Sequence, residues 1–179
     1  MDFSTRPLAP HPDEALPVPA TFTLTSNDAA DGDTLPQAQT AAGGSRSPHL
    51  KWSGFPPETR SFLLTCFDPD APTPAGFWHW MVVDLPASQT ELPAGAGISD
   101  LELEGAAFHL CNDTGEAGFF GAAPPAGDRE HRYVFSVYAL DTDSLDVDDE
   151  ATPTRAFFTS LQHVLARASL TLTYAEPAQ

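Results

Sequence analysis

Apolar residues along the chain group into short segments of strand length. Residues 21–26 alternate between apolar residues and threonines, which predicts a half-buried strand. A shorter strand is expected at residues 50–52. Residues 61–67 form an unbroken apolar run, which is typical of a central strand.

The second half of the chain continues this pattern. Residues 77–85 are aromatic and β-branched and predict another strand, and a short strand is expected at residues 106–111. Residues 131–140 are apolar on both faces, which favours a place in the middle of a sandwich. Alternation returns at residues 169–174. Together these segments predict a mainly β chain.

One segment follows helical spacing instead. Thr152 and Pro153 supply an N-cap followed by a proline at the first helical position. Arg167 would lie at the C-terminal end, where a cation is favoured. We therefore predict one helix, whose buried face carries Phe157, Leu161, Val164, Leu165 and Ala168.

The remaining segments indicate how a single domain is organised. Residues 1–20 are rich in proline and alanine without periodicity, and we expect an extended N-terminal arm before one domain at residues 21–179. Residues 27–46 and 112–130 are predicted loops, and the second carries several glycines and prolines. A loop of this length in a compact domain is usually functional or disordered. Prolines at residues 68–72 end the preceding strand in a turn.

Composition narrows the range of partners. The chain has 179 residues with a formal net charge of −17, from 25 Asp and Glu against 8 Lys and Arg. This charge repels phosphate backbones and anionic membranes, so we expect neither nucleic acid nor stable membrane insertion. The acidic surface, with Lys51 as the only lysine, fits either a salt-rich cytoplasm or a general bias of the host's proteins.

The expected location is the cytoplasm. The N-terminus lacks the basic start and apolar run of a signal peptide, and no apolar stretch approaches membrane-spanning length. Cys66 and Cys111 form no C-x-x-C pair, so no zinc cluster is expected. Cys66 lies in an apolar run and is predicted to be a small core residue.

Chemically versatile side chains gather at predicted strand ends. Asp68 and Asp70 follow one strand, His79 lies near the start of the next, and His131 begins a third with Tyr133 on the same face. A histidine is costly to bury unless its ring nitrogens have partners. We expect Asp68 or Asp70 to orient the histidines and to raise their pKa values.

These residues predict a small anion pocket without metal or cofactor. Two cationic histidines, His79 and His131, would contact a phosphate or carboxylate, with a further hydrogen bond from Tyr133. The long loop would contribute Gly121 and a wall formed by Pro124 and Pro125. Local charge can outweigh the acidic surface because screening limits interactions to about 8–10 Å. His11, His49, His109 and His163 are assigned no function.

Several ordered motifs resemble the phosphatidylethanolamine-binding protein family, in particular its bacterial and archaeal Raf-kinase-inhibitor-like branch. The resemblance extends over about residues 20–174 and includes the C-terminal segment. Its main motifs are Ser47-Pro48-His49-Leu50-Lys51-Trp52, Asp68-Pro69-Asp70-Ala71-Pro72, Trp78 to Pro86, Asn112-Asp113, Gly118 to Gly127 and His131-Arg132-Tyr133.

The resemblance implies a large antiparallel β-sandwich with a C-terminal helix. It also implies an anion pocket lined by Asp68, Asp70, His79, Pro125, His131 and Tyr133, a homodimer, and in some relatives a protein client that is inhibited. Two positions depart from the family pattern. Ala122-Ala123 replaces a Pro-x segment before Pro124, and Cys111 stands where a basic residue is common.

Three alternative functions remain open. The paired Asp and His residues suggest acid–base or hydrolytic catalysis, although no serine or cysteine lies in a recognisable nucleophile motif, and we expect no enzyme. Metal binding by two histidines and an aspartate lacks a metal-site spacing. A protein inhibitor could use the exposed loop at residues 112–130.

Overall fold

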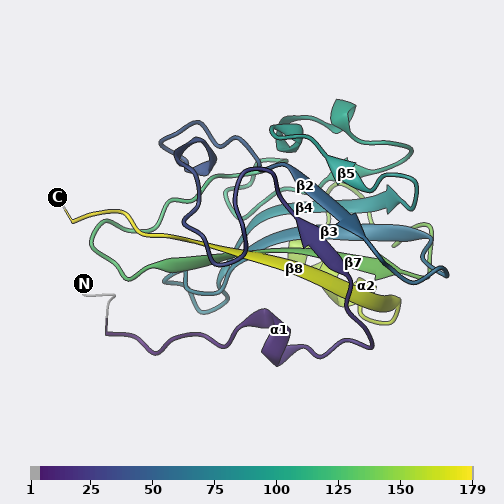
Figure 1. Ribbon diagram of the computed structural model, residues 1–179, viewed down its shortest axis with the longest axis horizontal. Coiled ribbons are helices and arrows are strands. Elements are labelled where there is room, and N and C mark those ends of the chain that lie inside the picture. Colours follow the sequence, from purple (N-terminus) through teal and green to yellow (C-terminus); the bar gives the residue numbers. More distant parts are fainter. Residues whose placement is uncertain (1–4, 179) are drawn as a thin grey trace.

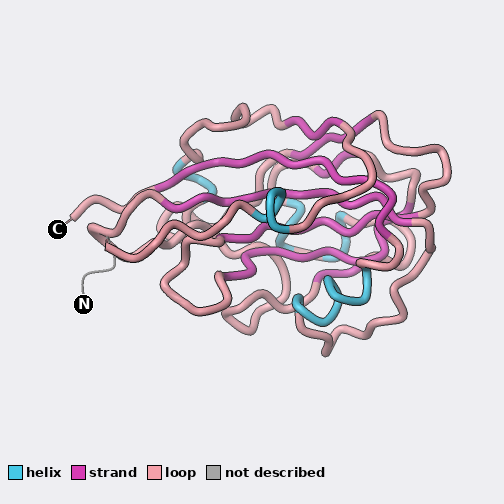
Figure 2. Tube along the Cα trace, turned by 90° about the horizontal axis from the view of Figure 1, so that it is seen from below, coloured by secondary structure: helices cyan, strands magenta, loops and turns pink. Residues whose placement is uncertain are grey.

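Strands dominate the computed structural model, which describes residues 5–178. They run along the long axis of the molecule, and long loops extend beyond their ends (Figure 2). The elements are α1 (Pro12–Ala15), β1 (Thr23–Thr25), η1 (Gln37–Gln39), β2 (Leu50–Ser53), β3 (Ser61–Asp68), β4 (Phe77–Pro86), β5 (Glu91–Leu92), η2 (Ala96–Ile98), η3 (Asp100–Glu102), β6 (Phe108–His109), β7 (His131–Leu140), α2 (Pro153–Ser160) and β8 (Val164–Tyr174).

The strands form two antiparallel sheets. The larger sheet has the order β6-β4-β3-β7-β8, and the smaller has the order β1-β2-β5 (Figure 1). β3 lies at the centre of the larger sheet, as its unbroken apolar run predicts, and β7 is its neighbour. Every predicted strand overlaps an observed strand, and β7 has the predicted limits. The predicted mainly β sandwich is therefore confirmed.

The main core fills the space between the sheets. Trp52 of the smaller sheet is buried against Phe62 of the larger sheet, with ring centroids 5.5 Å apart and nearly perpendicular planes. A second cluster covers the outer face of the larger sheet, where Tyr138 meets Phe157 of α2. Both faces of β3 and β7 are therefore covered by packed side chains.

The predicted C-terminal helix is correct at its start and wrong at its end. Thr152 is the N-cap, and its hydroxyl accepts a hydrogen bond from the Arg155 backbone amide at 3.2 Å. The helix ends at Ser160, and residues 164–168, which we predicted to be helical, belong to β8. Alternate residues from Ala166 to Leu172 are buried, as in a strand. Pairing with β7 therefore makes this segment a strand although its apolar residues also fit helical spacing.

The N-terminal arm is docked on the larger sheet. Its predicted residues 1–4 lie outside the described part, and the rest is extended apart from the short α1. The arm runs alongside β8 (Figure 1), where the Arg167 guanidinium donates to the Leu16 carbonyl oxygen at 2.8 Å and pairs with Asp13 at 3.0 Å. Among the described residues, none of the helices has the length and apolarity to cross a membrane.

Candidate functional site

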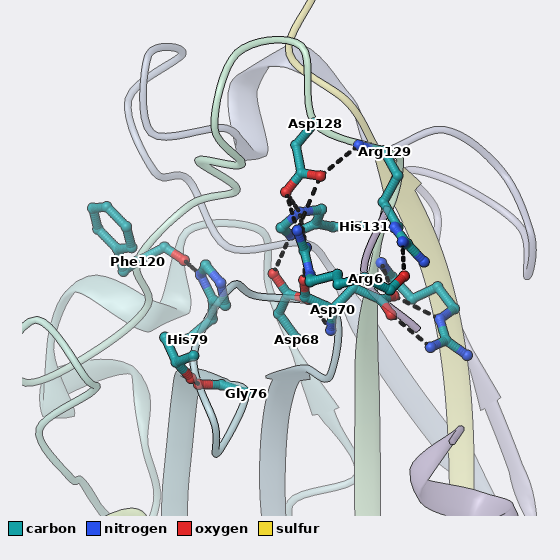
Figure 3. Close-up of polar contacts among 11 residues, drawn as sticks. Arg6, Asp68, Asp70, Gly76, His79, Phe120, Asp128, Arg129 and His131 are labelled. Carbon is teal, nitrogen blue, oxygen red and sulfur yellow. Dashed lines mark hydrogen bonds and ion pairs between the residues drawn. The ribbon is translucent and has the colours of Figure 1, made fainter. Parts of the chain in front are cut away.

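Sheet topology brings distant polar residues to one edge. β3 ends at Asp68, whereas its antiparallel neighbours β4 and β7 begin at Phe77 and His131. The end of one strand and the starts of two others therefore meet. Figure 3 shows the resulting cluster, with Asp68, Asp70 and His131 on one side and His79 on the other.

A cavity of about 180 Å³ opens at this edge. The cavity is lined by six of the eight ligand-binding residues that the sequence predicted: Asp68, His79, Pro124, Pro125, His131 and Tyr133. Asp70 and Gly121 are not among the lining residues. Gly121 has a packing role instead, since a Cβ there would lie 2.4 Å from the Thr40 backbone, and its amide donates to the Ser45 hydroxyl.

His131 is held between two carboxylates. Its Nδ1 lies 2.7 Å from an Asp68 oxygen and its Nε2 lies 3.0 Å from an Asp128 oxygen. Because a carboxylate only accepts, both ring nitrogens carry protons and the ring is cationic. Arg6 Nη2 is 3.3 Å from Nε2, farther away than Asp128, while Arg6 Nη1 pairs with Asp128 at 2.8 Å.

The charge of His131 follows from this arrangement. Burial alone lowers its pKa, but the hydrogen bonds and charges of Asp68 and Asp128 outweigh burial and raise the pKa. The orienting role predicted for Asp68 therefore has a geometric basis. Both N–H groups are already used, however, so His131 offers a ligand its charge and no free donor in this conformation.

Sequence reasoning missed Asp128 and Arg6. Asp128 lies in the long loop, three residues before His131, and its side chain is buried. In a chain with many acidic residues, one more aspartate in a loop carries no distinctive signal. Arg6 lies 122 residues from its partner, although it is the only basic residue in the arm besides a histidine.

Asp70 does not orient a histidine as predicted. Its carboxylate accepts two bonds from the Arg132 guanidinium, both at 2.7 Å, and one from the Arg132 backbone amide at 3.1 Å. Burial raises the pKa of Asp70, but the bonds and charge of Arg132 outweigh this effect and lower the pKa. Arg132 also donates to the Ala9 carbonyl oxygen at 2.7 Å, so the pair anchors the arm.

His79 is the extra residue of a β-bulge. Cys66 pairs with Trp80 and Phe67 pairs with Trp78, which leaves His79 without a partner on β3. A bulge turns two consecutive side chains toward the same face. Regular alternation along residues 77–85 predicts that His79 shares a face with both Phe77 and Met81. The structure places it on the face of Phe77 but not on that of Met81, which packs in the outer cluster, so the part of the prediction that concerns Met81 is wrong.

The partner of His79 also differs from the prediction. Its Nδ1 lies 2.8 Å from the Phe120 carbonyl oxygen, not beside Asp68 or Asp70 (Figure 3). Burial lowers the pKa of His79, and the Phe120 bond and the Asp68 charge only partly offset it. His79 is thus neutral near pH 7, and the expected pair of cationic histidines is reduced to one, His131.

Tyr133 brings an unused hydroxyl group to the cavity. The side chain is buried and its ring meets the His79 ring edge-on, with centroids 5.1 Å apart. Its hydroxyl makes no well-formed hydrogen bond with any described residue, although the Ala123 backbone is close enough to influence its pKa. Burial, followed by the charge of Asp68, raises that pKa far above its usual range. The hydroxyl is therefore a neutral donor.

Comparison with known proteins places this geometry in a family. The chain matches the family described as phosphatidylethanolamine-binding protein over residues 25–175. It is 44% identical to UPF0098 protein YbhB of Escherichia coli over 153 residues, covering 83% of this chain and 96% of YbhB. It is 42% identical to YbcL of the same organism, covering 87% of this chain and 88% of YbcL.

Solved structures agree with these sequence matches. The crystal structure of E. coli YbcL, described as a new member of the mammalian PEBP family, has a TM-score of 0.83 at 41% identity and covers 87% of this chain and 99% of that one. A Chlamydia trachomatis homologue, CT736, has a TM-score of 0.76 at 31% identity, with coverage of 87% and 98%. The chain therefore belongs to the phosphatidylethanolamine-binding protein family, in its bacterial branch.

Proposed function

We propose that the cavity beside His79 and Tyr133 binds a small oxyanion or phosphorylated head group without transforming it. The observation that carries this proposal is a pair of side-chain groups, the Tyr133 hydroxyl and His79 Nε2. Neither has a hydrogen-bond partner among residues 5–178, and both belong to residues that line one cavity. Buried polar groups are normally satisfied, so a cavity that leaves them unpaired is suited to a polar guest.

The size of the cavity limits the guest. A volume of about 180 Å³ accommodates a phosphate or carboxylate group, whereas drug-sized ligands occupy roughly 300–1,000 Å³. A longer molecule would therefore enter with its head group only. The walls are apolar rings and prolines from Phe77, Phe120, Pro124 and Pro125, and they strengthen each polar contact by excluding water.

Charge in the cluster is compatible with an anion. The carboxylates of Asp68 and Asp128 are each paired with a cation, His131 or Arg6, and Asp70 is paired with Arg132. The guest thus meets a balanced cluster instead of uncompensated negative charge. The remaining acidic surface is screened over about 8 Å at physiological ionic strength.

Regulation of a partner protein is an extension of the proposal. Phe120, Ala123, Pro124 and Pro125 belong to the predicted functional loop and line the cavity. A guest that contacts these residues would alter the loop surface that a client protein meets. The homodimer and the inhibited client that the family resemblance implies stay predictions.

A phosphate titration followed by NMR tests the proposed function. We expect the His79 ring signals to shift and saturate at millimolar phosphate at constant ionic strength, while the signals of half-buried His163, which lies outside the cavity, stay in place. Signals of His79 that do not respond near neutral pH would contradict the proposal.

Tyr133→Phe separates binding from folding. The variant removes the Tyr133 hydroxyl, which has no hydrogen-bond partner among the described residues. Phosphate binding should weaken about tenfold, equivalent to about 1.4 kcal/mol. The free energy of unfolding should stay equal or rise, because a buried hydroxyl without a partner is removed. Tyr174→Phe, which removes a hydroxyl bonded to Glu176, is the matched control and should leave binding unchanged.

A further inference from the structure

The hydrogen bond to Phe120 fixes the proton of His79. A carbonyl oxygen offers only lone pairs, so Nδ1, at 2.8 Å, must carry the N–H that donates to it. In the neutral ring the other nitrogen then has no proton. Nε2 is therefore a hydrogen-bond acceptor, and it bonds to none of the residues described between positions 5 and 178.

The surroundings keep the ring neutral. His79 is 3% exposed, and burial is the largest influence on its pKa, which it lowers. The charged groups that act on the ring are Asp68 at the end of β3, Asp113 in the loop after β6, and His131 at the start of β7. Asp68 and Asp113 oppose the effect of burial, while His131 reinforces it.

The cavity therefore presents one acceptor and one donor side by side. His79 Nε2 can only accept, and the Tyr133 hydroxyl, whose ring touches the His79 ring, can donate. A guest that satisfies both must offer an O–H group and a negatively charged or carbonyl oxygen on the same centre. A fully ionised oxyanion has no proton to donate, so its oxygen lone pairs would repel the lone pair of Nε2.

We propose that His79 makes the cavity selective for oxyacids that bring a proton, such as hydrogen phosphate or a singly protonated phosphate monoester. The inference rests on the proposed function and specifies its ligand class. The guest O–H donates to Nε2, or the proton moves along that bond to give an imidazolium and an ionised guest. In the second form the O–H bond of the guest breaks and an N–H bond forms at Nε2, with no other bond changed. In both forms one proton enters the cavity with the guest.

Sulfate has nearly the same shape as phosphate and carries no proton near neutral pH. Its binding requires His79 to take a proton from solvent, so its affinity should rise about tenfold for each unit by which the pH falls toward the His79 pKa. Phosphate brings its own proton and should bind at least about tenfold more tightly than sulfate at pH 7. The gap should close in acid.

Isothermal titration calorimetry of the full chain with inorganic phosphate and sulfate, from about pH 5.5 to 8, tests this proposal. In buffers of different ionisation enthalpy, sulfate binding should take up about one proton. His79→Phe should reduce the preference for phosphate to within about twofold. His109→Phe is the matched control, because His109 is also buried with a lowered pKa, stacks on Trp80 and lies outside the cavity; it should keep the preference.

The wild-type measurement decides the matter even if a variant fails to fold. Equal affinities for both anions at neutral pH, or a sulfate affinity independent of pH, would overturn the inference and leave the proposed function standing. A preference for phosphate that survives His79→Phe would also overturn it. Failure of both anions to bind at any pH would overturn the proposed function and the inference together.

Discussion

Replacing Asp68 with alanine is expected to lower the free energy of unfolding by about 3–5 kcal/mol. Asp68 and His131 are each at most 2% exposed, and their bond is 2.7 Å long. Asp128 stays beside His131 but already pairs with Arg6, so removing Asp68 leaves this buried cluster with two cations and one carboxylate in a medium that solvates charge poorly. Urea unfolding near pH 6 measures the loss.

The loss should depend on pH in a defined direction. The pKa of His131 is raised in the folded state, so its stabilisation is complete below its ordinary value of about 6.5 and fades as pH rises through the folded value. The difference between wild type and Asp68→Ala should therefore shrink toward about pH 9. A constant difference across this range would show that His131 is not charged in the folded protein.

Asp143→Ala is the matched control for Asp68→Ala. Asp143 also forms an ion pair, with Arg60, but both side chains are more than half exposed. Exposed pairs contribute little because water and salt screen them. We expect this variant to stay within about 0.5 kcal/mol of wild type at both pH values.

The strands, and which of them are buried on both faces, could be predicted from residue patterns, because a buried face requires apolar side chains. Residues 131–140 are apolar on both faces, and β7 lies inside the sheet with both faces covered. The end of α2 could not be predicted in this way. Residues 164–168 satisfy both helical and strand spacing, and only pairing with β7, a contact distant in sequence, decides between them.

The convergence of Asp68, His79 and His131 at one edge was likewise predictable, because strand ends in an antiparallel sheet meet there. The partners of these side chains were not. A bulge of one residue at His79 reverses the faces of the side chains from Trp80 to Val83, until a second register shift restores the alternation before Leu85. No feature of the local sequence marks the bulge. His131 also pairs with Asp128 of the long loop, and Asp128 in turn pairs with Arg6 of the N-terminal arm.

Arg132→Ala is expected to destabilise the protein by about 3 kcal/mol at neutral pH and by much less in acid. Asp70 is buried, and the Arg132 guanidinium holds it through two bonds of 2.7 Å. Without Arg132 the carboxylate keeps its burial and loses its counterion. The same variant removes the 2.7 Å bond to the Ala9 carbonyl oxygen, so the arm should exchange amide hydrogens faster.

The pH dependence follows from the pKa of Asp70. In wild type this pKa is lowered, so the pair stabilises the fold above the ordinary value of about 3.9, and the contribution is lost as pH falls through the folded value. In the variant, burial without Arg132 raises the pKa above the ordinary value, and protonation relieves the buried charge. Unfolding free energies measured near pH 7 and pH 3 should therefore converge in acid.

Two further substitutions separate the charge of Arg132 from its geometry. Arg132→Lys keeps the charge but cannot form the paired bonds, so it should recover only part of the lost stability. Arg60→Ala removes an exposed arginine from a surface pair and should change little at either pH. If Arg132→Ala were equally destabilising at pH 7 and pH 3, its cost would come from lost packing and the arm contact, and the ionised Asp70 would not be the cause.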